Sequence, residues 1–527
     1  MTKNKHSIQK VFLEIDTHSM QMANSIKNNM AMFIKNELVP ILEKQFNLIE
    51  NTDDQIIQIE KLELSIQINA EKNTSIFSNS STKIEFKNQI EKEIDKTINE
   101  LKSNSISSEE NSIIFNTISS EEKQIKTLLY FMEYGAMPWW IGKNDEFNNL
   151  EKINTIELQK LNFKNSFRKL IQQRKIQERV INQFSNTTLA VVIASLSKTV
   201  INEEKIAKNS LLKLINNQSF EYKKSFWQAI FELLNEGKSI SIVQLYHRYS
   251  SLFQSSKITF PVFIQNLKSL VLIDLDEDEC FATYKNQLIQ KKSEEKSRIK
   301  SRENDDEKQL DFEIKEPNSN FKEDQNLIEL TSTSSQTESN QQNFSDEINT
   351  NSEASSYNFN ENQYKSIYVE NAGLIILHPF LKQLLKSCDL LSENNIIVNK
   401  ELAAHILHYA ATKRENDFEH TMLFEKFLCG IPLLQSIKRE IKIEEKHKQN
   451  VEEMLLAVVQ HWSVLKNTSI DVLRSEFLQR EGKLDCSESN PKLTIERKTQ
   501  DLLLEKIPWN INIVKIPWME KLMYTQW

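Results

Sequence analysis

The alternation of apolar and polar side chains at the start of the chain predicts a small α/β unit. Apolar and polar side chains alternate with a period of two over residues 8–16 and 56–68, which is typical of half-buried strands. The second run loses this alternation at residues 60–61, as it would at a β-bulge. Between them, residues 20–48 carry apolar side chains three or four positions apart, which indicates an amphipathic helix. We therefore expect residues 1–70 to form a strand–helix–strand unit.

The middle of the chain follows the three- and four-residue spacing of helices. Residues 71–120 are rich in Ser, Asn, Glu and Lys and predict a polar connector with one helix at residues 84–101. Residues 121–290 predict a helical region, whose first helix stops at Gly135. Several short amphipathic helices follow without a fixed repeat, which favours a bundle or an irregular array of helix pairs.

A polar linker, residues 291–363, interrupts this pattern. It begins with a run of mixed charges and continues as a stretch rich in Ser, Asn, Gln and Glu. Such a composition buries too little apolar surface to offset chain entropy, so we expect the linker to be disordered. Fully stretched, it would span roughly 240 Å at ~3.3 Å per residue, and it separates the chain into two halves.

The second half, residues 364–527, returns to helical spacing and ends in strand-like runs. The expected helices cover residues 373–387, 401–412, 421–428, 449–467 and 470–481, and the expected strands cover residues 493–497 and 510–516, with residues 501–506 fitting either type. The predicted fold class is therefore mainly α, with small α+β portions at the N- and C-terminal ends and several domains around a disordered central linker.

Glycine is scarce, and its scarcity excludes several classes of enzyme. The chain has six glycines in 527 residues, about 1% against a typical ~7%. No two of them have the spacing of G-x-S-x-G, G-x-G-x-x-G or a phosphate-binding loop, and no histidine is followed by glutamate, so H-E-x-x-H is absent too. The net charge of −8 argues against a general nucleic-acid binder, which needs a basic face.

The sequence predicts neither a membrane helix nor a secretory signal. Apolar stretches such as residues 189–196 are far shorter than the ~20 residues that a membrane helix needs, and the basic N-terminal segment lacks a continuous apolar core. The four cysteines form no C-x-x-C pair, so we expect reduced thiols in a cytoplasmic protein. They are Cys280, Cys388, Cys429 and Cys486.

His405 and His408 form the first cluster that could carry chemistry. They lie three positions apart on a predicted helix and share a face with Glu401, so two imidazoles and a carboxylate could seed a zinc site. No third strong ligand is fixed by the sequence. A solvated polar face is the simpler interpretation, and we expect no metal and no cofactor.

A cysteine and an acidic run are the other candidates. Cys429 precedes a glycine and could act as a nucleophile if His420 or His378 approached it, although such a cysteine is more often a small apolar side chain at a helix end. Residues 276–279 are all acidic but lack the spaced ligands and the glycine of a calcium-binding loop. We expect a solvated loop there and no catalytic residue in the chain.

Tryptophan next to proline is the more informative signal. Trp139 and Trp140 follow a proline, and Trp509 and Trp518 each follow one as well. Tryptophan is large, rigid and amphipathic, and a preceding proline fixes the backbone that aims it. These rings are therefore either core residues that cap small domains or anchors at an interface with another protein.

The rare residues gather in short motifs that follow one another in a fixed order. They are GAMPWW at residues 135–140, NAGLIILHPFL at 371–381, EKFLCGIP at 425–432, WSVLKNTS at 462–469, RSEFLQREGK at 474–483, and IPW at 507–509 and 516–518. In their amino-acid sequences and in their order, these motifs resemble those of the tape-measure proteins of contractile injection systems. The resemblance is dense over residues 366–527 and moderate over 1–70 and 120–145.

The resemblance assigns an interaction or structural role to the residues of these motifs. They are Gly135, Pro138, Trp139, Trp140, Asn371, Gly373, His378, Pro379, Phe380, Cys429, Gly430, Pro432, Trp462, Arg474, Phe477, Arg480, Gly482, Pro508, Trp509, Pro517 and Trp518. The family implies a non-enzymatic protein that helps set tube and sheath length. It brings no catalytic residues and no cofactor.

The resemblance also implies partners and a location. The partners are the baseplate hub or spike and the inner-tube proteins, self-association in the tube lumen stays open, and neither nucleic acid nor membrane insertion is implied. The protein would be cytoplasmic during assembly and then part of the particle or released from it. An assembly chaperone or baseplate adaptor is the nearest alternative, followed by a tube-loaded effector. As one continuous helix the chain would reach only ~790 Å at 1.5 Å per residue, which is short for a ruler.

Overall fold

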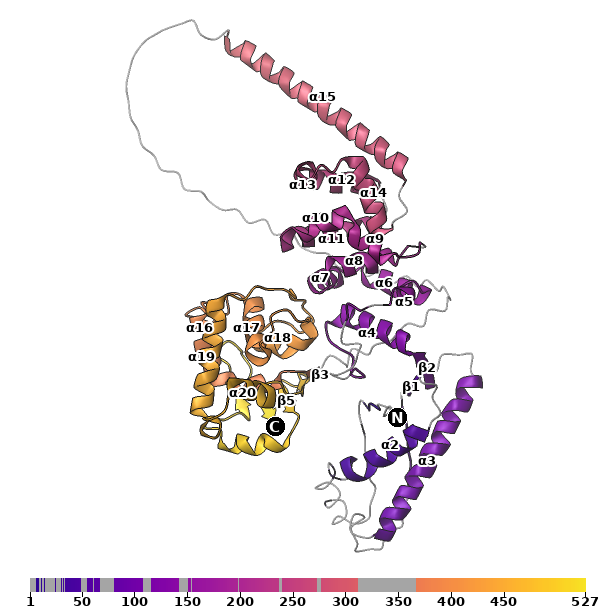
Figure 1. The fold of residues 1–527 in the computed structure, drawn as a ribbon, viewed down its shortest axis with the longest axis vertical. Coiled ribbons are helices and arrows are strands. Elements are labelled where there is room, and N and C mark those ends of the chain that lie inside the picture. The colour runs from indigo at the N-terminus through magenta and orange to yellow at the C-terminus, as the bar shows by residue number, and fades with distance from the viewer. Residues whose placement is uncertain are drawn as a thin grey trace, which may run out of the picture. The chain divides into compact units, whose positions relative to one another are not determined.

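The computed structural model of the chain is mainly helical, with one mixed sheet near the C-terminus and a small sheet near the N-terminus (Figure 1). Residues 1–275 and 365–527 form one compact unit and residues 276–364 a second. The structure describes residues 6–8, 11, 14, 24, 30, 32, 34–48, 55–59, 61–66, 80–107, 115–141, 150–152, 154–197, 199–236, 239–272, 276–310 and 366–527.

Two helices and a two-stranded sheet make up the N-terminal part. A π-helical turn, η1 (Ile34–Leu38), leads into α2 (Val39–Leu48), and α2 packs on the long helix α3 (Ser80–Ser107). Strand β1 (Gln55–Ile59) pairs in antiparallel fashion with β2 (Phe115–Ser119). The six residues that form the buried core here are Leu38, Ile41, Leu42, Ile90, Ile94 and Ile98.

The expected strand–helix–strand unit is only partly correct. The strand expected over 56–68 ends at Ile59, and residues 61–66 form no strand. Its partner is β2, which lies in the region that we expected to be a polar connector. The strand expected over 8–16 lies mostly outside the described residues. Periodicity missed β2 because a strand of five residues carries too little pattern.

The central helices follow the predicted spacing. Helix α4 (Ser120–Tyr134) begins at the side chain of Ser119, which caps the N–H of Glu122, and it ends at Gly135, as expected. Next come α5 (Thr155–Leu158), α6 (Leu161–Leu170), α7 (Arg174–Gln183), α8 (Asn186–Ala194), α9 (Glu203–Lys208), α10 (Ser210–Asn216), α11 (Phe220–Glu236), α12 (Ser239–Arg248), α13 (Ser250–Ser255) and α14 (Phe260–Val271). The spacing of apolar residues did not predict α9, α12 and α13 as separate helices.

Helix α15 (Glu277–Leu310) belongs to the second unit. It continues to Leu310, well inside the segment 291–363 that we expected to be disordered. Glu, Lys and Arg are good helix formers, so a mixed charge run extends a helix once it has started. Residues 311–365 lie outside the described residues, and the disorder expected there stays a prediction.

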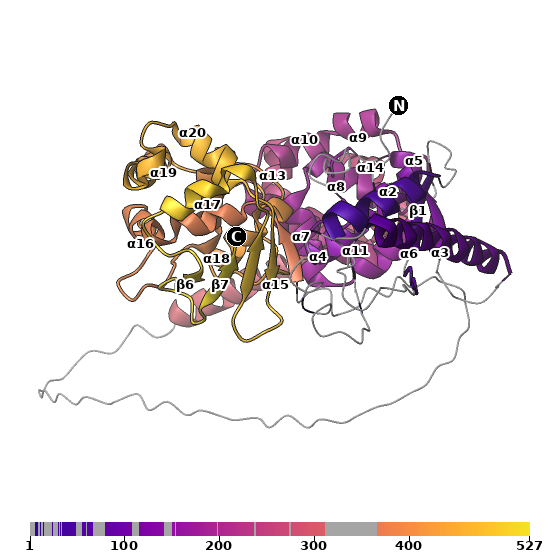
Figure 2. The ribbon, with the colours of Figure 1, turned by 90° about the horizontal axis from the view of Figure 1, so that it is seen from below.

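The C-terminal part packs helices against one face of a five-stranded sheet (Figure 2). Its strands are β3 (Ser366–Val369), β4 (Gly482–Asp485), β5 (Lys492–Ile495), β6 (Ile513–Val514) and β7 (Met523–Gln526), in the order β3-β4-β5-β7-β6. Only the β5–β7 pair is parallel. Buried and exposed residues alternate along β4, β5 and β7, so one face of the sheet meets the core.

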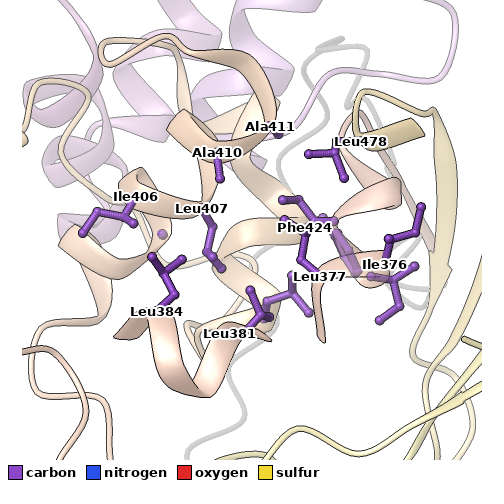
Figure 3. Close-up of a cluster of buried hydrophobic side chains, with 14 of the residues drawn as sticks. Ile376, Leu377, Leu381, Leu384, Ile406, Leu407, Ala410, Ala411, Phe424 and Leu478 are labelled. Carbon is purple, nitrogen blue, oxygen red and sulfur yellow. The ribbon is translucent and has the colours of Figure 1, made fainter. Parts of the chain in front are cut away.

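The helices of this part lie where the sequence predicts them, except the last, which covers residues 501–506, a segment that fits either helix or strand by its sequence. They are the 3₁₀ helix η4 (Ala372–Leu377), α16 (His378–Ser387), α17 (Lys400–Thr412), the 3₁₀ helix η5 (Glu419–Met422), α18 (Leu423–Leu428), α19 (Glu445–His461), the 3₁₀ helix η6 (Ser463–Leu465), α20 (Ile470–Leu473), the π-helix η7 (Arg474–Leu478) and the 3₁₀ helix η8 (Thr499–Lys506). Their apolar side chains converge in one core, part of which appears in Figure 3. The short strands β3, β4 and β7 were missed.

A glycine allows the centre of this core to close. The backbone of η4 lies directly against η7, and a Cβ atom on Gly373 would lie 1.7 Å from the carbonyl oxygen of Phe477. No side chain fits there. Gly373 therefore fixes how closely the two elements of the NAGL and RSEFL motifs can approach.

Candidate functional site

A fully buried arginine joins the central helices to the C-terminal part. Arg179 of α7 donates from Nη1 to the carbonyl oxygens of Met132 (3.0 Å) and Glu133 (2.7 Å), which end α4. Its Nη2 donates to the carbonyl oxygen of Leu434, and its Nε donates to Glu419 Oε1 at 2.5 Å. One side chain therefore connects α4, α7, η5 and the loop after α18.

Glu419 is the acidic centre of this junction. It is fully buried, and while Oε1 accepts from Arg179, Oε2 accepts from Lys426 Nζ at 3.2 Å and from the N–H of Ile437 at 3.3 Å. Its own N–H donates to Gln183 Oε1 at 2.8 Å. Two cations thus share one carboxylate out of contact with water, an arrangement that is stable only when every group is paired.

Burial has the largest influence on the pKa of Lys426. It lowers the pKa of this ammonium group, and the nearby Glu419 carboxylate opposes the shift. The ammonium group also donates to the carbonyl oxygen of Leu433 at 2.8 Å. The carbonyl oxygens around Arg179 and Lys426 thus supply the negative partial charge that one carboxylate cannot supply to two cations.

Gly135 makes room for the ion pair. It caps α4 with φ at +69°, in the left-handed region, and its N–H donates to the carbonyl oxygen of Phe131. A Cβ atom here would lie 2.5 Å from Glu419 Oε1 and 2.8 Å from Arg179 Nε. The first residue of the GAMPWW motif, Gly135, must therefore be a glycine because Glu419, which is far along the chain, lies against it.

An aromatic layer seals the junction beside the charges. The Phe131 ring meets Phe184, Phe418 and His420 edge to face, with centroids 5.7–5.9 Å apart. The guanidinium of Arg439 lies 4.0 Å from the centroid of the Phe418 ring. These rings come from both halves of the chain, so they keep water from the buried ions.

Hydrogen bonds fix the register of the two halves along α7. Gln183 Nε2 donates to the carbonyl oxygen of Ile437 at 2.7 Å, and Asn182 Nδ2 donates to Ser436 Oγ at 3.1 Å. The N–H of Arg439 donates to the carbonyl oxygen of Asn182 at 3.1 Å. The halves that we expected to lie apart, on either side of a linker, are therefore packed into one body.

The two histidines proposed as metal ligands are fully buried, so the expected solvated face is wrong. The His408 ring lies between Asp417 Oδ2 (2.8 Å from Nε2) and Glu425 Oε1 (2.9 Å from Nδ1). The His405 ring lies between the carbonyl oxygens of Glu415 and Lys438. Helix α17 is enclosed on nearly all sides, which explains the burial. Within the described residues, no group of three His, Cys, Asp or Glu side chains could hold a metal ion.

The surroundings of the two rings shift their titration in opposite directions. Burial lowers the pKa of His405. Burial also favours the neutral form of His408, but hydrogen bonds to the carboxylates of Asp417 and Glu425 outweigh it and raise the pKa of His408 to about 9. Asn371 of the NAGL motif donates to Glu425 Oε1 at 2.7 Å. His408 is thus a buried cation that is hydrogen-bonded to two carboxylates.

The other residues that the sequence offered as candidates for catalysis or metal binding have structural roles. Burial raises the pKa of the Cys429 thiol, which disfavours the thiolate that a nucleophile needs. The His378 ring is hydrogen-bonded to the carbonyl oxygen of Asn510 at 2.9 Å. The acidic run at 276–279 starts α15 instead of forming a loop, and Asp276 Oδ1 accepts from the N–H of Glu279.

The tryptophans of the C-terminal part point into it. The indole N–H of Trp462, Trp509 and Trp518 donates to the carbonyl oxygens of Leu503, Ile376 and Leu428, at 3.2, 3.0 and 2.7 Å. Trp139 and Trp140 are half-buried, as Trp509 and Trp518 are, and they form a T-shaped pair with centroids 5.8 Å apart.

The remaining motif residues lie around the same core or at its turns. Arg480 is fully buried against Asp501 Oδ1 at 2.7 Å, and Arg474 pairs with Glu452 and Asp471. Phe477 packs on Trp462, and Phe380 packs on Trp509. Pro379 begins α16, Gly430 has a φ of +65°, and Gly482 lies against Ala372. Pro138, Pro432, Pro508 and Pro517 lie in connecting segments.

Sequence reasoning missed Arg179, Glu419 and Lys426. One signal could have revealed the first. On α7, Arg179 shares the buried stripe with Ile176, Val180 and Gln183, so it is a charge where helical spacing expects an apolar residue. No local pattern indicates which distant carboxylate it meets.

Arg179, Glu419 and Lys426 contact one another and backbone groups within the fold. The model of the contractile injection system tape measure protein family matches residues 5–527, so the chain belongs to this family. No curated protein and no solved structure matches the chain. The family has a structural role as a component of a contractile particle. Among the described residues, no helix is both long enough and apolar enough to cross a membrane.

The junction predicts that Glu419→Gln destabilises the protein strongly. The substitution keeps the size of the side chain but leaves Arg179 and Lys426 buried without a counter-ion, so we expect a loss of about 3–5 kcal/mol in the free energy of unfolding, measured with urea. The matched control is Glu221→Gln. Glu221 pairs with Lys438 at 3.2 Å but is 75% exposed, so we expect a loss below ~1 kcal/mol. Equal losses in the two variants would contradict this account.

His408 predicts a loss of stability in mild alkali. Because its folded pKa is raised from 6.5 to about 9, its contribution is fully present below pH 6.5 and is lost as the pH rises through 9, which amounts to about 3 kcal/mol. Urea unfolding at several pH values measures this slope. His408→Gln should lack this part of the slope, and an unchanged slope in that variant would show that another group titrates.

Proposed function

We propose that this tape measure protein helps set tube and sheath length through contacts with baseplate and tube components. These contacts would be made by residues 1–275 and 365–527 as one unit, which we call the locked body. The observation that carries the proposal is the buried Arg179–Glu419–Lys426 junction, which holds the central helices and the C-terminal part together. Both halves then present their surfaces in one fixed arrangement. A partner can recognise that arrangement as a whole.

The junction argues against a simple linear ruler. Such a ruler would use residues 291–363 as a strap between two separated ends. Separating the ends exposes the aromatic layer and leaves charges unpaired, and breaking one buried ion pair already costs about 3–5 kcal/mol. While the junction stays closed, the segment leaves and re-enters the same body, so it can reach outward by no more than about half its contour length.

An assembly chaperone or a baseplate adaptor remains the alternative function. It is favoured by the same closed arrangement, because a compact body can act at one place in the particle without spanning it. A chaperone differs from an adaptor and from a retained tape measure because it is absent from the finished particle. Mass spectrometry of purified particles would detect an adaptor or a retained tape measure and would not detect a chaperone. In either case the protein acts in the cytoplasm while the particle assembles.

A deletion series tests whether the linker is the span. Deleting residues 315–337 or 315–359 from the full chain removes up to ~150 Å of extended contour at ~3.3 Å per residue without touching α15 or β3. We expect no shortening of the mean particle length in proportion to the residues removed, measured by electron microscopy, because both ends of the segment are held in one body. Particles that shorten in proportion to the residues removed would contradict the locked body.

The matched control is a strain that lacks the protein. If the protein sets length, these particles should be absent or should vary widely in length, and the full chain should restore a narrow distribution. Uniform particles in its absence would overturn the proposed function itself.

A further inference from the structure

One surface of the central helices combines exposed cations with half-buried aromatic rings. We call it the basic–aromatic surface, and it consists of Tyr130, Trp139, Trp140, Lys169, Arg174 and Lys175. It lies outside the buried junction, whose charges all have partners.

The cations come from α6, α7 and the residues beside them. Residues 160–179 hold seven Lys or Arg, of which Arg179 is buried in the junction, and one acidic residue, Glu178. Lys169, Arg174 and Lys175 are exposed, and Arg174 reaches Glu178 only at 3.9 Å, with 83% of its side chain in solvent. An exposed pair of this length contributes little to stability. This part of the surface thus keeps a net positive charge.

The charges lie close to α4. Burial raises the pKa of Glu133, and Lys175, Lys169 and Arg179 oppose that shift, in this order, so both lysines lie near this carboxyl. Tyr130 lies one turn earlier on the same helix, and burial, with a smaller effect of Glu133, raises its pKa to about 12. Helix α4 also packs against α6 and α7, so the helices that carry the lysines lie beside the helix that carries Tyr130.

The aromatic rings of the surface are half-buried and pack on one another. Trp140 packs on Tyr130 with centroids 6.1 Å apart and on Trp139 at 5.8 Å. Within the part of the chain that the structure describes, the indole N–H of Trp140 is buried and has no acceptor. Rigid aromatic side chains next to Lys and Arg are typical of sites where one protein anchors another.

We propose that the basic–aromatic surface binds residues 311–364 of a second copy of the chain. That segment has eleven acidic residues and two lysines, a net charge of −9, whereas the whole chain has −8, so the rest of the chain carries +1. The acidic residues are Asp311, Glu313, Glu316, Glu323, Asp324, Glu329, Glu338, Asp346, Glu347, Glu353 and Glu361, and the lysines are Lys315 and Lys322.

The segment also has apolar side chains for the aromatic part of the surface. Phe321, Leu327 and Phe344 are examples, each within a few residues of an acidic side chain. A nucleic acid has the negative charge but no aliphatic side chains. The acidic polypeptide therefore matches both the charge and the chemistry of the surface.

A second copy suits the proposed function, on which this inference rests. One chain of this length is short for a ruler, and a locked body is shorter still. Copies joined by the acidic segment of one and the basic surface of the next would form a head-to-tail series. Such a series could measure an object longer than any one copy.

The test is self-association of the full-length chain by sedimentation velocity. We expect wild-type protein to associate at low ionic strength and to dissociate at about 0.5 M salt, where the Debye length falls to roughly 4 Å. The double variant Lys169→Glu/Lys175→Glu should weaken association at least tenfold. Lys205→Glu/Lys208→Glu makes the same charge change at exposed positions of α9 and should leave association unchanged.

A mixing experiment makes the test specific. The Lys169→Glu/Lys175→Glu variant keeps the acidic segment, and the chain lacking residues 315–359 keeps the basic surface. Each should be monomeric alone, and the mixture should form a complex. Circular dichroism checks that both are folded.

Three results would overturn the inference. The first is wild-type protein that is monomeric at every salt concentration. The second is a mixture that does not associate. The third is a monomer whose acidic segment resists proteolysis only when Lys169 and Lys175 are present, which would place the contact within one copy. None of these results depends on particle length, so failure here is distinguishable from failure of the proposed function.

Discussion

A single buried carboxylate, Glu419, sets the arrangement of this protein. It neutralises two buried cations that come from different halves of the chain, Arg179 and Lys426. Buried ions add little stability when paired but are very costly when one partner is removed. The junction therefore acts less as a source of stability than as a requirement that both halves be present and in register.

Other features of the structure follow from that requirement. Gly135 must be glycine because a side chain would displace the ion pair, and the edge-to-face rings around Phe131 keep water away. With the halves held together, residues 276–364 connect two parts of one compact unit in the sequence. The chain belongs to the tape measure family, and we propose that it works through the surfaces of the locked body rather than through its stretched length.

Periodicity within the sequence predicts the helices well and the long-range contacts poorly. Helix α4, its stop at Gly135 and the helices of the C-terminal part all follow from local spacing. The four-residue strands are too short to show a period, and their partners lie far along the chain. The reason for Gly135 is a residue at position 419, and the burial of His405 and His408 depends on elements packed around α17, so neither can be inferred from neighbouring residues.

The central claim is that residues 1–275 and 365–527 form one body, and a single measurement tests it directly. A specific protease site placed within residues 331–337 of the full chain allows the connection to be cut after folding. The account predicts that the two fragments elute together in gel filtration and unfold in one transition, because the buried ions and rings hold them. Fragments that elute separately under native conditions would contradict it.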